Sequence, residues 1–98
     1  MKNIIESLDK LLESRIRLGI MSVLMVNDSM DFNSLKQMLD VTDGNLASHI
    51  SALEKSRYIK IKKRILGKKT NTTYSVTDPG RNAFLKHLDG LQRLIKNK

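Results

Sequence analysis

The sequence predicts a small α+β domain, mainly α-helical, in which several helices precede a two-stranded β-ribbon and a final helix. Three observations predict this class. Apolar residues recur at helical spacing through the first half of the chain and again near its end. Between residues 58 and 77 the period changes to two, as in half-buried strands. The length of 98 residues, 40% of them apolar, allows one modest core.

The N-terminal part is predicted to form two helices. Apolar residues at helical spacing predict the first helix over residues 3–12. Ser14 is typical of a cap or break before a second helix, which we expect over residues 15–27. The sequence NDSMD then predicts a turn.

A short helix and a tight connection follow. Asn33 is predicted to cap a helix whose Leu35 and Leu39 face inward. The sequence DVT closes this helix, and Thr42 is placed to cap the next one. Asp43 then stands in a first turn, where a negative charge is favourable for the helix dipole.

The next helix, TDGNLASHISALEK, has an unusual outer face. Leu46, Ile50 and Leu53 share one side at helical spacing and predict burial. A surface helix that serves only solubility more often carries Glu and Lys, so short polar side chains indicate another use. The residues left outside are Asn45, Ser48, His49, Ala52 and Lys55.

The β-ribbon is predicted from YIKIKKRIL and TTYSVT, joined by a turn that contains Gly67. In the first strand Ile59, Ile61 and Ile65 alternate with basic residues, as in a half-buried strand. Lys63 interrupts the apolar side, so we expect burial to weaken toward the tip.

The sequence TDPGR is typical of a helix start. Thr77 or Asp78 is predicted to cap the helix, and Pro79 sits early, where its missing N–H costs little. An apolar stripe then runs along the helix, made of Phe84, Leu88, Leu91 and Ile95.

Charge is unevenly spread along the chain. Residues 55–77 hold eight basic residues and no acidic one, and the other 75 residues hold ten of each sign. The whole net charge of +8 therefore lies in this segment. Such concentrated basicity is the electrostatic footprint of a polyanionic partner.

Several classes of function are disfavoured. The chain has no cysteine, which excludes disulfides, cysteine-based zinc sites and thiol chemistry. Glu6 and Asp9 interrupt what would be the apolar core of a secretion signal, and apolar runs are short, so a cytoplasmic location is expected. The two histidines lie in different predicted helices, and no phosphate-binding glycine loop or catalytic triad is evident. We expect neither a cofactor nor an enzyme.

Residues 32–84 resemble a winged helix-turn-helix DNA-binding domain. The matching motifs are DVTDGNLASHISALEKSRYI, as turn, recognition helix and first wing strand, and TTYSVTDPGR, as return strand and helix start. The chain is most similar to small stand-alone bacterial regulators related to the multiple-antibiotic-resistance regulator (MarR) and arsenical-resistance regulator (ArsR) families. The likeness to ArsR concerns shape only, because thiolate chemistry is impossible here.

The resemblance implies three sets of DNA contacts. The helix start and outer face of residues 43–55 would read bases in the major groove. The preceding helix would contact phosphates, and the wing would lie along the backbone or the minor groove. The implied residues are Asn33, Ser34 and Lys36; Asp43, Gly44, Asn45, Ser48, His49, Ala52 and Lys55; and Lys62, Arg64, Lys68, Lys69, Thr70 and Asn71.

The resemblance also implies a homodimer that binds a pseudo-palindromic operator in double-stranded DNA. The dimer would form through the terminal helices, residues 1–13 and 79–98. The interface residues would be Ile4, Ile5, Leu8, Leu12, Phe84, Leu88, Leu91 and Ile95.

The leading hypothesis is a sequence-specific transcriptional regulator that acts as a repressor near the nucleoid. An architectural, replication-associated or phage accessory DNA-binding protein is the alternative, and a protein–protein adaptor is disfavoured by the basic segment. A small-molecule effector stays open, because the methionines offer a lining without a convergent polar anchor.

Overall fold

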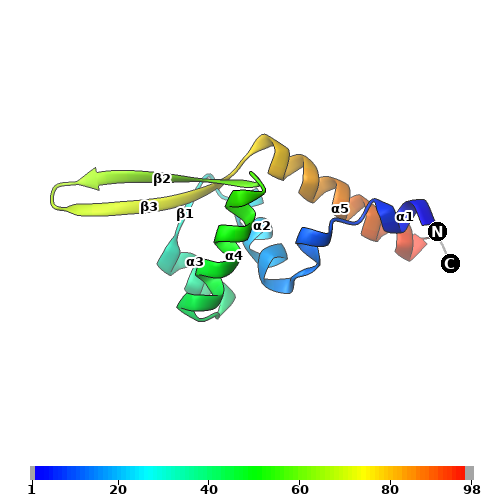
Figure 1. Ribbon diagram of the computed structural model, residues 1–98, viewed down its shortest axis with the longest axis horizontal. Coiled ribbons are helices and arrows are strands. Elements are labelled where there is room, and N and C mark those ends of the chain that lie inside the picture. Colours follow the sequence, from blue (N-terminus) through cyan, green and yellow to red (C-terminus); the bar gives the residue numbers. More distant parts are fainter. Residues whose placement is uncertain (1, 97–98) are drawn as a thin grey trace.

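The chain folds into helices around a small antiparallel sheet, and the computed structural model describes residues 2–96. The molecule measures 56 × 25 × 21 Å, because the β2–β3 hairpin extends from one end and α1 and α5 from the other (Figure 1). In chain order the elements are α1 (Lys2–Glu6), the 3-10 helix η1 (Lys10–Glu13), α2 (Arg15–Met25), β1 (Met30–Asp31), α3 (Phe32–Leu39), α4 (Asp43–Lys55), β2 (Ile59–Leu66), β3 (Lys69–Val76) and α5 (Asp78–Lys96).

Helix α2 lies at the centre of the core. It contacts η1, α3, α4, β3 and α5. Its residues Ile20, Met21 and Leu24 are fully buried, and Leu35 of α3 and Leu46 of α4 are buried against the same cluster. The apolar stripes that predicted these helices therefore meet around α2.

The sheet has three strands in the order β1-β3-β2, all antiparallel. The predicted ribbon of β2 and β3 is confirmed, but the NDSMD segment was predicted to be only a turn and ends in strand β1. Strand β1 was missed because its two residues are too few to show the alternating pattern that predicts a strand. Burial weakens along β2 as predicted, from 2% exposure at Ile59 to 81% at Ile65.

The single N-terminal helix predicted over residues 3–12 is wrong, because the chain forms α1 and then η1 with a break between them. Asp9 makes the break favourable. Its backbone N–H donates to Nδ1 of His87 at 2.9 Å, and its Oδ1 accepts the backbone N–H of Leu11 at 2.9 Å. A tertiary hydrogen bond and a local cap thus replace helical hydrogen bonds.

Caps define most of the other helix ends. Thr42 caps α4 as predicted, with its Oγ1 accepting the backbone N–H of Asn45 at 3.2 Å. At α5 the hydroxyl of Thr77 accepts the N–H of Gly80 at 3.0 Å. Asn33, however, is not an N-cap: α3 begins at Phe32, and Asp31 stands in the cap position without a side-chain cap bond.

Candidate nucleic-acid interface

Helices α3 and α4 are joined by a three-residue turn. Asp40 ends α3 in the left-handed conformation, with φ 52°, and lets the chain reverse before Thr42 starts α4. Both helices pack on α2. The result is a helix-turn-helix whose second helix is held from one side only, which leaves its opposite side free.

The free side of α4 is polar and uncharged over most of its length. Of the residues predicted there, Gly44, Asn45, Ser48 and Lys55 are exposed, whereas His49 and Ala52 are half-buried. Three further residues of α4 are exposed and were not predicted, Ala47, Ser51 and Glu54. Ser51 lies opposite Leu46, Ile50 and Leu53, and Ala47 and Glu54 lie on the flank of the helix, so a helical wheel centred on those three apolar residues predicts the exposure of Ser51.

His49 lies at the edge of this free side, where it meets the first turn of α2. Its Nδ1 is 3.0 Å from Nη1 of Arg17, and Nε of Arg17 donates to the carbonyl oxygen of Leu11 at 2.6 Å. Partial burial and then the charge of Arg17 lower the pKa of His49 below its ordinary value of about 6.5. Both effects favour the neutral form of the ring.

The residues predicted to contact phosphates from α3 are partly committed to other contacts. Nζ of Lys36 lies 2.8 Å from Oδ1 of Asp43, which ties α3 to the first turn of α4. Both side chains are well exposed, at 41% and 71%. Asn33 is exposed and Ser34 is half-buried. The charge of Lys36 is thus balanced by a neighbour that the sequence analysis placed in the same interface.

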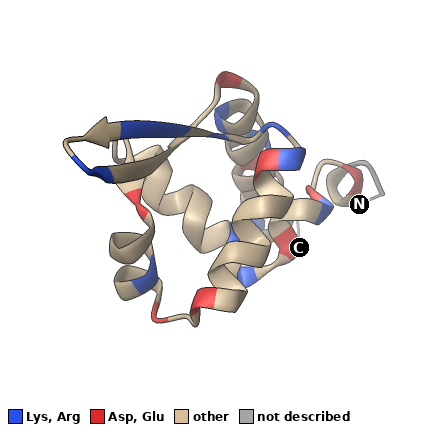
Figure 2. Ribbon diagram, turned by 60° about the vertical axis from the view of Figure 1, so that its left-hand side comes forward, with Lys and Arg blue, Asp and Glu red and all other residues tan. Residues whose placement is uncertain are grey.

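The β2–β3 hairpin, here called the wing, carries six exposed basic residues, more than any other element of the described chain (Figure 2). The predicted residues Lys62, Arg64, Lys68, Lys69 and Thr70 are exposed, and Asn71 is half-buried. Lys60, Lys62 and Arg64 alternate on one face of β2, opposite the face that carries Ile59. Together with Asn71, Thr73 and Ser75 of β3, they line a shallow open groove.

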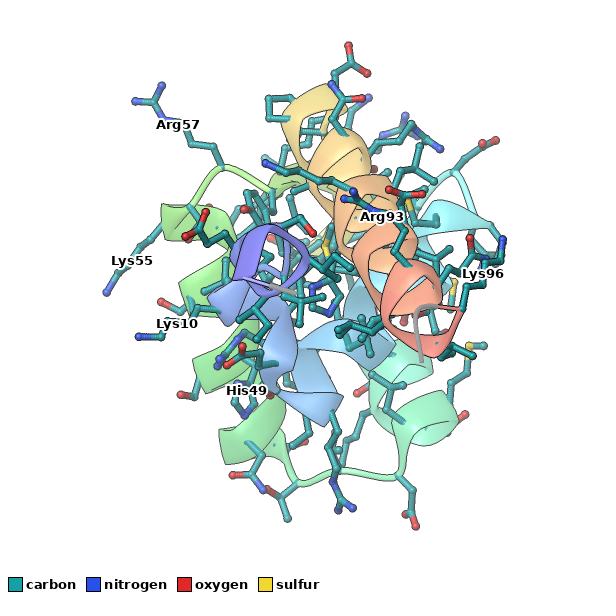
Figure 3. The ribbon with its side chains drawn as sticks, turned by 90° about the vertical axis from the view of Figure 1, so that its right-hand side faces the viewer. Lys10, His49, Lys55, Arg57, Arg93 and Lys96 are labelled. Carbon is teal, nitrogen blue, oxygen red and sulfur yellow. The ribbon has the colours of Figure 1, made fainter. Side chains whose placement is uncertain are left out.

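The wing follows α4 in the chain, and a three-residue turn joins the C-terminal end of α4 to β2. The wing projects beyond α3 and α4, away from the C-terminal end of α5 (Figure 1). Figure 3 shows Lys10, Lys55 and Arg57 on the side of α4, whereas Arg93 and Lys96 lie on α5. Lys10 and Arg57 were not among the predicted contacts; Lys10 was assigned to a terminal helix and so was overlooked.

The residues predicted for the dimer interface fall into two groups. Leu12 and Ile4 are only 1% and 6% exposed within the single chain, so their surface is already covered. Phe84 also packs against the core. Ile5, Leu88 and Ile95 are exposed, whereas Leu8 and Leu91 are half-buried. Helix α5 therefore has one face against the body of the chain and a second apolar face that is open.

Two further features of the described residues bear on function. Within residues 2–96 no three or more His, Asp or Glu side chains gather in a way that could hold a metal ion. No helix in the same range is long and apolar enough to cross a membrane.

A three-stranded sheet, a helix-turn-helix and a projecting basic hairpin define the winged helix class. The winged helix DNA-binding domain family matches residues 16–95, so the chain belongs to this family. The resemblance stated from the sequence and the predicted fold class are both confirmed.

Three similar proteins extend the comparison. An uncharacterized protein of Methanocaldococcus jannaschii is 33% identical over 88 residues, which cover 90% of this chain and 96% of that protein. The structure of a transcriptional regulator homologue from Pyrococcus horikoshii is 32% identical, with a TM-score of 0.84, and the match covers 97% of this chain and 92% of that one. PadR of Bacillus subtilis, solved in complex with operator DNA, is 14% identical with a TM-score of 0.67; 76% of this chain matches 46% of that chain.

Proposed function

We propose that this protein is a transcriptional regulator that binds specific sequences in double-stranded DNA. The observation that carries the proposal is the free side of α4, which offers small hydrogen-bonding side chains next to a wing with exposed cations. The major groove is about 12 Å wide and admits one helix, so these side chains can reach base edges. The wing cations would hold the phosphate backbone.

The residues divide by role. On α4, Asn45, Ser48 and Ser51 would read bases, since amide and hydroxyl groups both donate and accept hydrogen bonds. Lys10 and Arg57 would extend the backbone contacts beside α4. The phosphate contacts carried over from the sequence analysis are Asn33, Ser34, Lys36, Lys62, Arg64, Lys68, Lys69, Thr70 and Asn71.

We further propose that the regulator is a homodimer that represses by occluding its operator. The open face of α5, with Leu88 and Ile95, would pair with its copy across a twofold axis. The two α4 helices would then enter major grooves about one helical turn apart, on a pseudo-palindromic site. Repression by covering the operator does not require a surface that activates transcription.

The test is selection of bound duplexes from a random library, followed by binding measurements at several salt concentrations. We expect a shared motif in the selected sequences. Ser48→Ala should change the preferred bases, whereas Lys68→Ala should weaken all sequences alike and reduce the salt slope by about 0.9 per protomer. Lys96→Ala also removes one cation, but on α5, and should leave both unchanged.

The affinities for selected and random duplexes distinguish a sequence-specific regulator from an architectural DNA-binding protein. An affinity ratio near one between selected and random duplexes would indicate an architectural DNA-binding protein. The absence of measurable binding to any duplex, even at low salt, would instead favour a partner other than nucleic acid.

A further inference from the structure

Arg17 is well placed to determine how His49 forms hydrogen bonds. Arg17 belongs to the first turn of α2, and its guanidinium group is held by the carbonyl oxygen of Leu11 at 2.6 Å. From there Nη1 reaches Nδ1 of His49 at 3.0 Å. The guanidinium is thus fixed at one end before it meets the imidazole.

The contact between Arg17 and His49 is compatible with only one position of the proton on the neutral imidazole ring. A guanidinium group has five N–H donors and no acceptor. The atom of His49 that faces it must therefore accept, so Nδ1 carries no proton. A neutral imidazole with an unprotonated Nδ1 carries its proton on Nε2.

We propose that Arg17 is a positioning residue that fixes His49 as a hydrogen-bond donor, through Nε2–H, at the edge of the DNA-reading side of α4. The proposal rests on the proposed function and adds the chemical class of the group that His49 recognises. That group must be an acceptor, such as O6 or N7 of guanine or O4 of thymine. The amino group of cytosine is rejected, because two donors would then face each other.

A matched reference exists within the same chain. His87 is the other histidine, it is 4% exposed, and its Nδ1 accepts the backbone N–H of Asp9. Its ring is therefore also protonated on Nε2, with the N–H of Asp9 rather than Arg17 as the donor to Nδ1. Ring signals of His87 report whether the surrounding fold is intact, while those of His49 report the Arg17 contact.

The first experiment measures the nitrogen chemical shifts of both imidazole rings by NMR at neutral pH. In the unmodified protein both rings should show a protonated Nε2. Arg17→Met should turn His49 into a mixture of tautomers and leave His87 unchanged, and Arg17→Lys should restore the Nε2–H form, since Nζ also donates. A protonated Nδ1 in the unmodified protein, or a tautomer that ignores Arg17→Met, would overturn the proposal.

The second experiment tests recognition by library selection. Arg17→Met and His49→Ala should each reduce the preference for one base, at the same position of the selected motif, by about tenfold. The double variant should reduce that preference no further. Relaxation at no position would refute the base-reading role and point to a phosphate acceptor. If the unmodified protein selects no motif, the proposed function fails, while the ring tautomer still decides the role of Arg17.

Discussion

At the residue scale, the ion pair between Lys36 and Asp43 limits the charge that α3 can offer to a phosphate. Asp43 also places a negative charge beside the proposed backbone contacts. Replacing it by Asn would free Lys36 and keep the size of the side chain, while removing a negative charge that favours the first turn of α4. We expect Asp43→Asn to bind DNA severalfold more tightly and to steepen the salt slope by up to about 0.9 per protomer, which corresponds to one phosphate contact.

Fluorescence anisotropy at several salt concentrations measures both quantities. Asp89→Asn is the control, because Asp89 also pairs with a cation, Arg93, but on α5, and should leave the slope unchanged. Weaker binding by Asp43→Asn would show that the carboxylate positions α4 rather than competing for Lys36.

The hydroxyl of Tyr58 donates to Oδ2 of Asp9 and joins the turn after α4 to the segment before η1. Burial, and then the Asp9 contact, raise the pKa of Tyr58 from about 10 to about 12. The folded state keeps the phenol proton where the unfolded chain releases it. This contribution to stability is therefore complete below pH about 10 and is lost as the pH rises toward 12.

Ultraviolet titration of tyrosinate in a Tyr74→Phe background isolates this group. We expect its midpoint near pH 12, and a lower midpoint in Asp9→Asn, where the carboxylate charge is gone. A midpoint near pH 10 in the Tyr74→Phe protein that keeps Asp9 would mean that the hydrogen bond from Tyr58 to Asp9 does not form in solution.

At the scale of elements, α5 starts directly against the turn that leads into the wing. A Cβ built on Gly80 would lie 2.0 Å from the carbonyl oxygen of Tyr58, which is backbone and cannot move aside alone. The same oxygen accepts hydrogen bonds from the N–H and hydroxyl of Thr77. Close approach of α5 thus holds the base of the wing.

We expect Gly80→Ala to lower the free energy of unfolding by about 3 kcal/mol, at the upper end of overpacking effects. Urea unfolding followed by circular dichroism measures it. Gly44→Ala is the matched control, because nothing lies within 4 Å of its added Cβ and alanine favours helices. Equal stability of the two variants would mean that α5 does not dock on Tyr58 as described.

Helices could be predicted from the sequence where the helical spacing of apolar residues and a capping residue indicated the same helix start. Helix α4 has both, and its bounds Asp43–Lys55 were predicted correctly. The break between α1 and η1 was not predictable, because it depends on a contact from Asp9 to a residue 78 positions away. The exposure of Ser51 was missed, although it could have been predicted from the apolar pattern of α4. The contacts of His49 with Arg17 and of Lys36 with Asp43 could not, because they depend on how α4 packs on α2 and α3.

At the scale of the whole molecule, the open apolar face of α5 is the feature that the single chain does not explain. Leu88 and Ile95 are 42% and 71% exposed, and Ile5 of α1, which packs on α5, is 59% exposed. Burying such side chains against a second copy would contribute about 25 cal/mol per Å² of apolar area. We expect Leu88→Glu with Ile95→Glu to shift the protein from dimer to monomer in sedimentation experiments.

DNA binding should respond to the same change. A monomer engages one half-site at a time, so the double variant should lose affinity for a full operator by at least about 100-fold but keep its affinity for a single half-site. Val26→Glu is the control, because Val26 is 81% exposed and belongs to neither α1 nor α5. A double variant that remains dimeric, or an unmodified protein that is monomeric at micromolar concentration, would exclude this face as the interface and leave the regulator to bind DNA through a single winged helix.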